Sequence, residues 1–173
     1  MPANSVDGIG QIESTAEQAE ALYGRAWSLH LAGQVEDAVG LYKQALNAHP
    51  RPGHVGNDLG VALRATHRLD EAIAAYQRAL DQDPAAADTW SNLGNACREA
   101  GDCVAAISAL KMACELEPNE PLYRQNLGFA LMQHRDFAEA AKSFESSLAL
   151  QPDNTDAAFR LGIVRLHQGQ FRE

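Results

Sequence analysis

Two asparagines in the stretch TWSNLGNA, Asn92 and Asn95, are the residues whose chemistry is easiest to assign. A carboxamide offers two hydrogen-bond donors and an acceptor, so it can bond both the N–H and the C=O of an extended backbone without reading its side chains. Chemistry of this kind favours recognition of a peptide. The alternative, which the sequence leaves open, is that these asparagines, and Asn126 one repeat after Asn92, are only solvated residues on a helix surface.

The sequence shows no pattern typical of catalysis or of a metal site. Its six histidines are scattered, without a His-Glu-x-x-His motif, and we expect them at the surface. The stretch DGIG, residues 7–10, has no preceding strand and no third glycine, so it predicts a turn and not a dinucleotide-binding loop. The three cysteines contain no Cys-x-x-Cys and predict reduced core residues: Cys97, Cys103 and Cys114. We therefore expect no catalytic residue, no metal and no cofactor.

Composition bounds the class of protein. The chain has 173 residues, of which 46% are hydrophobic, enough for a folded domain with a core. Its formal net charge of −9 repels phosphate backbones and anionic membrane surfaces, which argues against nucleic acid and membrane partners. Without a signal-like N-terminus or a run of about 18 apolar residues, we expect a soluble, cytoplasmic protein.

Several residue series recur every 34 positions, which is the signature of a repeat architecture. Prolines mark the period first, at Pro50, Pro84, Pro118 and Pro152. Small residues, leucines and large apolar residues follow the same step, in the series Ala38, Ala72, Ala106 and Ala140; Ala26, Gly60, Gly94, Gly128 and Gly162; Leu59, Leu93, Leu127 and Leu161; and Tyr42, Tyr76, Leu110 and Phe144.

These series match the pattern W-x-x-L-G-x-x-Y, then A-x-x-x-F, then P, so the chain resembles tetratricopeptide repeat (TPR) proteins. The third repeat matches best, with Trp90, Leu93 and Gly94 in its first helix. The first repeat departs most, because Arg25 stands where leucine is usual, and Gly56 replaces a large residue in the second.

The resemblance implies an all-α fold, a right-handed superhelical solenoid of helix-turn-helix hairpins. A hairpin cannot bury its own apolar face, so successive repeats stack. Glycines at Gly33, Gly101 and Gly169 are expected at the turns inside the hairpins, and each proline after the second helix. We expect four full repeats and a truncated fifth within a TPR domain over residues 15–173: 19–52, 53–86, 87–120, 121–154 and the partial 155–173.

The two ends of the sequence carry separate expectations. Ser14 to Glu17, STAE, reads as a capping box, which predicts that the first helix starts near residue 15 and that residues 1–14 form a flexible segment. The chain stops at Glu173, one residue before the next alanine of the 34-residue series. We therefore expect a piece of a longer protein, with a natural terminal deletion as the alternative.

In the family, one face of the first helix of each repeat, carrying positions 2, 5, 9 and 12 with position 6 beside them, lines a groove for peptides. The resemblance implies the same role here for Asn57, Asp58, Arg64, Ser91, Asn92, Asn95, Arg98, Gln125, Asn126, Phe129, Met132 and Phe159. The series is rich in amides in the middle and more apolar toward the C-terminal end, which suits an extended peptide better than a small molecule.

Asn92 and Asn126 both occupy position 6, which resembles the asparagine ladder in the repeat arm of O-linked N-acetylglucosamine transferases. The match is partial, because the other repeats have Gly24, Asp58 and Arg160 there. Our first hypothesis is a non-catalytic module that binds a protein or peptide partner. The alternative is the substrate-recognition arm of a longer enzyme such as a glycosyltransferase. A third hypothesis is self-association through an open C-terminal end that carries Leu161, Leu166 and Phe171.

Overall fold

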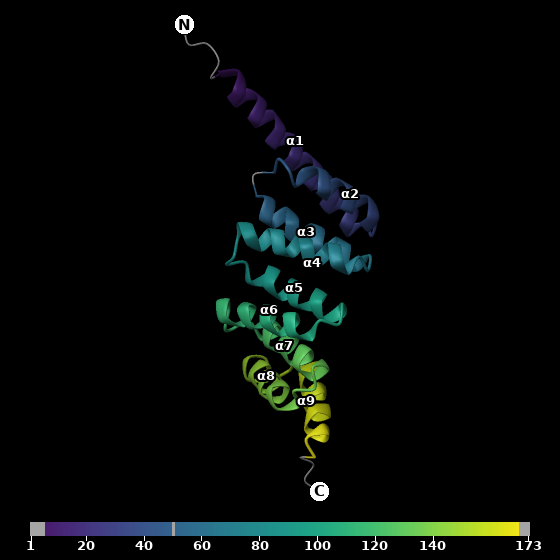
Figure 1. Cartoon of the computed structure of the whole chain (residues 1–173), viewed down its shortest axis with the longest axis vertical. Coiled ribbons are helices and arrows are strands. Elements are labelled where there is room, and N and C mark those ends of the chain that lie inside the picture. The colour runs from purple at the N-terminus through teal and green to yellow at the C-terminus, as the bar shows by residue number, and fades with distance from the viewer. Residues whose placement is uncertain (1–5, 50, 170–173) are drawn as a thin grey trace. The chain divides into compact units, whose positions relative to one another are not determined.

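The computed structural model describes residues 6–49 and 51–169, and this part of the chain is all-α (Figure 1). Two compact units divide it: unit 1, Met1–Pro84, and unit 2, Ala85–Glu173. Unit 1 contains α1 (Val6–Leu31), α2 (Val35–Ala45), α3 (Pro52–Ala65) and α4 (Leu69–Gln82). Unit 2 contains α5 (Ala87–Glu99), α6 (Cys103–Leu116), α7 (Pro121–Gln133), α8 (Phe137–Leu150) and α9 (Thr155–His167).

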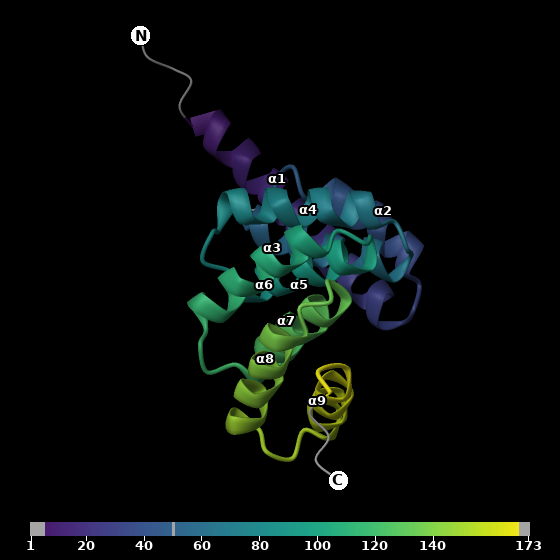
Figure 2. The same cartoon turned by 60° about the horizontal axis from the view of Figure 1, so that its bottom comes forward.

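Each unit consists of helical hairpins whose two helices pack against one another. In unit 1, α1 packs on α2 and α3 on α4, and the contact of α2 with α3 joins the hairpins. In unit 2, α5 packs on α6 and α7 on α8, while α7 also contacts α5 and α6, and α8 contacts α9. Figure 2 shows α7 and α8 side by side. The predicted all-α hairpin architecture is confirmed as four hairpins and an additional helix in the described chain, whereas the superhelical handedness stays a prediction.

The small residues of the repeat lie where two helices of a hairpin approach most closely. Ala38, Ala72, Ala106 and Ala140 are all fully buried. A Cβ added to Gly60 would lie 2.5 Å from Tyr76, and one added to Gly128 would lie 2.7 Å from Phe144. The large residue of the second helix therefore occupies the space that a side chain on the first helix would need.

The turns inside the hairpins adopt the left-handed conformation that the 34-residue spacing predicts. Gly33, Gly101 and Gly169 have φ of 79°, 88° and 67°. At the same position of the other two repeats, His67 and Arg135 adopt φ of 59° and 67° without being glycine. The backbone of His67 and Arg135 is therefore strained, because a Cβ is unfavourable at positive φ.

The second helices end before the prolines, as expected: α4, α6 and α8 end at Gln82, Leu116 and Leu150. Pro50 lies outside the described residues.

Two expectations for the N-terminal region are wrong. Because α1 begins at Val6, the residues of DGIG are helical instead of forming a turn, and Thr15 lies within a helix instead of starting one. No proline interrupts Val6–Leu31, so the helix continues through a sequence that also fits a capping box. Residues 1–5 of the expected flexible segment lie outside the described part.

Candidate functional site

The candidate binding surfaces are the faces of the first helices of the repeats, here called the helix-A faces. The face in unit 1 is formed by α1 and α3 and includes Asn57, Asp58 and Arg64. The face in unit 2 is formed by α5, α7 and α9 and carries the remaining nine candidates. Their side chains differ in exposure and in hydrogen bonding, and these differences decide which of them are free to meet a ligand.

In unit 1, Asp58 is a link between helices. The Tyr23 hydroxyl of α1 donates to Asp58 Oδ2 over 2.8 Å and lies 2.9 Å from His54 Nε2. Asn57 Nδ2 donates to Asp58 Oδ1 over 3.3 Å. Burial, and then the hydrogen bond to Asp58, raise the pKa of Tyr23 to about 12. The buried Asp58 carboxylate therefore serves mainly to join α1 to α3.

In unit 2, two of the predicted amides play the same linking role. Asn126 Nδ2 donates to Ser91 Oγ over 3.2 Å, from α7 to α5, and Asn126 is only 9% exposed. Gln125 donates to Asp156 Oδ2 over 2.8 Å and accepts from Asn154 Nδ2 over 2.7 Å, which joins α7 to α9. The alternative that both position-6 asparagines are merely solvated is wrong for Asn126, because the neighbouring first helix covers it.

A third link was missed by the sequence analysis. The Tyr123 hydroxyl donates to Asp88 Oδ1 over 2.6 Å, and burial followed by this bond raises the Tyr123 pKa. The links Tyr23 to Asp58, Ser91 to Asn126 and Asp88 to Tyr123 each span 35 residues. A hydrogen-bond donor and an acceptor that lie 35 residues apart in the sequence, one repeat plus one residue, would therefore have predicted such contacts.

Within the described residues, the side chains of Asn95 and Arg98 on α5 form no polar link to a neighbouring helix. Asn95 is half-buried and has no hydrogen-bond partner within the described chain. Arg98 Nε is buried without a partner, and Arg98 Nη2 lies 4.0 Å from the nearest carboxylate, that of Glu99. Asn92 and Asn57 are half-buried and have interactions within the protein, as does Arg64.

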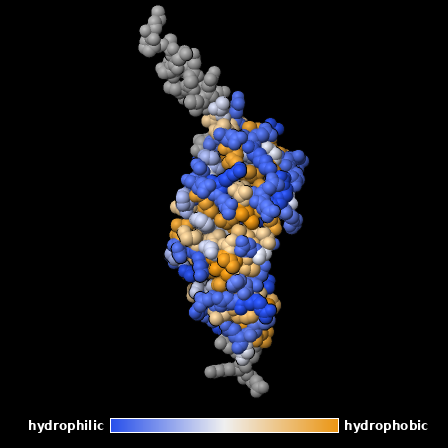
Figure 3. All heavy atoms as spheres, viewed as in Figure 1, coloured by the Kyte–Doolittle hydropathy of each residue, from blue (hydrophilic) through white to orange (hydrophobic). Residues whose placement is uncertain are grey.

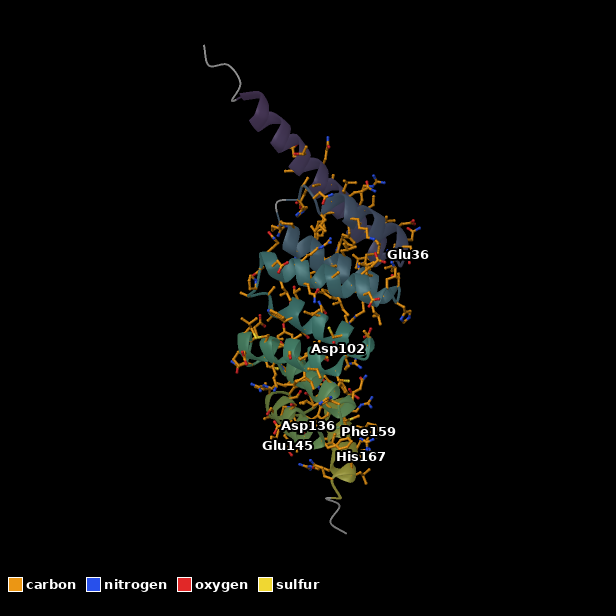
Figure 4. The ribbon with its side chains drawn as sticks, in the orientation of Figure 1. Glu36, Asp102, Asp136, Glu145, Phe159 and His167 are labelled. Atoms are coloured by element: carbon orange, nitrogen blue, oxygen red, sulfur yellow. The ribbon has the colours of Figure 1, made fainter. Side chains whose placement is uncertain are left out.

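The apolar end of the unit 2 face lies on α7 and α9. Phe129 is half-buried, meets Phe144 edge-on with ring centroids 5.5 Å apart, and has the Arg160 guanidinium 5.3 Å above its ring. Met132 is partly buried against the same core. Phe159 is 65% exposed, and Figure 4 shows its position on α9. Leu122 at the start of α7 is 53% exposed.

The other reactive side chains of the described residues are histidines, cysteines and acidic residues. No group of three or more histidine, cysteine or acidic side chains in this part of the chain could hold a metal ion. The three cysteines are free, and burial raises the pKa of Cys97 and Cys114, which lowers their nucleophilicity at neutral pH. Within the helices described, none is both long and apolar enough to cross a membrane.

His49 corrects the expectation that all histidines lie at the surface. Its side chain is fully buried, with Nε2 2.7 Å from Glu20 Oε2 and Nδ1 accepting from the Arg51 amide over 3.0 Å. His49 follows α2 and packs against α1, where the centroid of the Tyr23 ring lies 5.1 Å from that of the imidazole.

The sequence matches the tetratricopeptide repeat models over residues 57–121 and 126–173, and over residues 20–51. The chain therefore belongs to the tetratricopeptide repeat family. It is a TPR scaffold, of a family that is typically non-catalytic. No curated protein matches the chain in sequence.

Solved structures show the same fold at low sequence identity. A crystal structure of MamA protein has a TM-score of 0.83 at 21% identity and covers 89% of this chain and 84% of its own. YrrB, described as a TPR protein with an unusual peptide-binding site, has a TM-score of 0.76 at 22% identity, covering 94% of this chain and 84% of its own. The first TPR of Spaghetti (RPAP3), bound to the HSP90 peptide SRMEEVD, has a TM-score of 0.66 at 24% identity, covering 68% of this chain and 93% of its own.

The resemblance to an asparagine ladder stays a prediction, as does the hypothesis of a glycosyltransferase arm. Asn126, one of the two asparagines on which both depend, donates to Ser91 within unit 2.

Proposed function

We propose that unit 2 binds an extended peptide of a partner protein along the helix-A face of α5, α7 and α9. The observation that carries this proposal is the combination of a two-thirds exposed aromatic ring, Phe159, with a carboxamide at Asn95 that has no partner in the described chain. An apolar anchor and an adaptable polar group on one face are the components that a peptide site requires.

The roles of the candidate residues divide according to their contacts. Ser91, Gln125 and Asn126 hold neighbouring first helices together and thereby fix the spacing of the face. Asn95 and Arg98 contact the peptide backbone and its acidic groups. Phe159 takes an apolar side chain of the peptide, with Phe129 and Met132 as partly buried support.

Two of the similar structures support peptide binding as the type of function. The Spaghetti (RPAP3) repeat is bound to an HSP90 peptide, and YrrB is described as having a peptide-binding site. Their identity to this chain is below 25%, so the partner is not transferred with the fold. The specific ligand therefore has to be identified by selecting peptides that bind to this chain.

The test selects random 12-residue peptides on the wild-type chain and measures their Kd by fluorescence anisotropy. Phe159→Ala is expected to weaken binding about 10-fold or more, and Asn95→Ala about 2- to 10-fold, since one neutral hydrogen bond is worth roughly 0.5–1.5 kcal/mol. Leu150→Ala, an exposed apolar residue on α8, is the matched control and should leave Kd unchanged. If every selected peptide binds both site variants as tightly as wild type, the proposal is wrong.

We also infer a second candidate function, self-association through α9, which one observation favours. The glycine of the repeat accepts a large side chain of the second helix at Gly60, Gly94 and Gly128, but no described atom lies within 4 Å of a Cβ built on Gly162. Leu166 on the same helix is 58% exposed. A helix of a second copy could fill this place. Light scattering that gives a monomer mass across a wide concentration range would exclude this function.

A further inference from the structure

Unit 2 has a second surface outside its helix-A face, a half-open groove of about 300 Å³ between α6 and α8 with α7 as its floor. Its apolar lining consists of Val104 and Ile107 from α6 and Leu127 and Leu131 from α7. Charged side chains at its edges are Lys111, Asp136 and Glu139. We call this surface the α6–α8 groove.

Unit 1 has the equivalent groove between α2 and α4, and ion pairs span it. Lys43 Nζ lies 2.9 Å from Glu71 Oε2, which joins α2 to α4. Arg68, just before α4, reaches Glu36 of α2 over 3.3 Å and Glu71 over 2.7 Å. These charges hold the pKa of Glu71 down at about 2, with the bonds from Arg68 and Lys43 as the causes. Every charge of this set is compensated within unit 1.

The residues at the same repeat positions of unit 2 form no such bridge. Glu139 corresponds to Glu71, but it pairs with Lys142 of its own helix over 2.5 Å. Lys111 corresponds to Lys43 and has no ion-pair or hydrogen-bond partner in the described part of the chain. Lys111 is therefore a positive charge without an ion pair at the edge of the α6–α8 groove, beside the carboxylates of Asp136 and Glu139.

Two further positions change the side chains at the edge of the groove in unit 2, although its volume of about 300 Å³ is close to the 350 Å³ of the groove in unit 1. Val104, 64% exposed, stands where unit 1 has Glu36, which Figure 4 labels near the start of α2. Asp136 stands where unit 1 has Arg68, and its carboxylate caps α8 by accepting from the Glu139 amide over 3.3 Å. Apolar residues also reach the surface of unit 2 between hydrophilic ones (Figure 3). The groove of unit 2 therefore has a valine and a lysine without an ion pair where unit 1 has a glutamate and a lysine bound in ion pairs.

We propose that the α6–α8 groove docks a segment of a partner protein that carries a carboxylate next to a bulky apolar side chain. The carboxylate pairs with Lys111, and the apolar side chain lies on Val104, Ile107 and Leu131. Charge complementarity selects this occupant, because the carboxylates of Asp136 and Glu139 are already engaged and Lys111 is not. A volume of about 300 Å³ is at the lower end for a small-molecule pocket and suits side chains of a peptide.

The test uses the same random 12-residue peptides, selected on the wild-type chain, and separates this groove from the helix-A face by variants. Val104→Glu introduces the residue type that unit 1 has at this position, and Lys111→Gln removes the unpaired charge. Both positions are exposed, so the fold should persist, which circular dichroism checks. Phe159→Ala on the helix-A face is the matched control.

We expect one class of selected peptides to combine an acidic residue with an adjacent aliphatic or aromatic one. Their Kd should rise about 10-fold or more with Val104→Glu and roughly 3- to 10-fold with Lys111→Gln, and stay within about 2-fold with Phe159→Ala. Lys142→Ala should also weaken them, because it frees Glu139 to reach Lys111 as Glu71 reaches Lys43.

The proposal is overturned if no selected peptide depends on Val104 and Lys111, or if the peptides that do depend on them are basic. Peptides that depend only on Phe159 would support the helix-A face and refute the α6–α8 groove. Peptides that depend only on Val104 and Lys111 would support the α6–α8 groove and refute the helix-A face. The two proposals can therefore fail independently.

Discussion

Asn126 Nδ2 on α7 donates to Ser91 Oγ on α5 over 3.2 Å, and both residues are buried. Asn126 occupies the position that resembles a ligand contact, but its side chain contacts the neighbouring repeat. Asn95, one turn beyond Ser91 on α5, has the opposite character, since it is half-buried and has no hydrogen-bond partner in the described residues. The two asparagines should respond differently to mutation.

Asn126→Ala is expected to lower the free energy of unfolding by about 1–2 kcal/mol, because it removes a hydrogen bond and leaves the buried Ser91 hydroxyl unsatisfied. Asn95→Ala is the matched control and should change stability by less than about 0.5 kcal/mol. Urea unfolding followed by circular dichroism measures both. Equal losses in the two variants would contradict the assignment of Asn126 as the link.

Tyr23→Phe removes the donor to the buried Asp58 carboxylate and is expected to cost about 1.5–3 kcal/mol at pH 7. Folding raises the pKa of Tyr23 from 10.0 to about 12, so its contribution is present below pH 10 and is lost as the pH rises toward 12. Wild type should therefore lose more stability than the Phe variant between those pH values. Urea midpoints at pH 7, 10 and 11 test this, and parallel curves for the two proteins would refute it.

Arg135→Gly is expected to stabilise unit 2. Arg135 holds φ at 67°, a region that costs a residue with a Cβ roughly 1–2 kcal/mol, and the greater freedom of glycine in the unfolded chain offsets part of this. The free energy of unfolding should rise by about 0.5–1 kcal/mol. Gly101→Ala at the same repeat position, φ 88°, should lower it by about 1–2 kcal/mol. A destabilised Arg135→Gly protein would mean that the arginine side chain has contacts that outweigh the strain.

Gly128→Ala and Gly162→Ala exchange the same residue at the same repeat position, but they should have opposite effects. A Cβ on Gly128 would lie 2.7 Å from the buried Phe144 ring, so the core must shift, at a cost of about 1–3 kcal/mol. A Cβ on Gly162 meets no described atom within 4 Å, so the variant gains about 1 kcal/mol of helix propensity. Thermal unfolding of the two variants at low protein concentration compares them. Destabilisation of the Gly162 variant would indicate that another helix already packs there.

Much of the fold could be predicted from the sequence because the repeat imposes the same packing problem every 34 residues. The alanines of the period are buried, and its glycines except Gly162 lie where the helices of a hairpin meet. The turn position adopts positive φ in all five repeats, including the two without glycine. The prediction failed at the N-terminus, where a capping-box pattern is compatible with a helix interior once the preceding residues are helical too.

The candidate site was predicted less well, because helix position gives the face of a residue but not its partner. Phe159 and Asn95 are at least partly exposed on the predicted face, whereas Asp58, Ser91 and Asn126 lie on it but are buried and hydrogen-bonded to a neighbouring first helix. The difference depends on which side chain of the preceding or following repeat can reach each residue, and a single repeat does not contain that information.

The sequence alone therefore determined the repeat, its small and large positions and its hairpin turns, since these follow from local periodicity and from the size of each side chain. Only the tertiary structure decided which polar side chains bond to another helix and which have no such partner. The pair Lys43–Glu71 in unit 1 and the unpaired Lys111 in unit 2 occupy equivalent positions, and the difference arises because Lys142 binds Glu139 on its own helix. A pairing of this kind is set by distances between side chains of different helices, which no period in the sequence encodes.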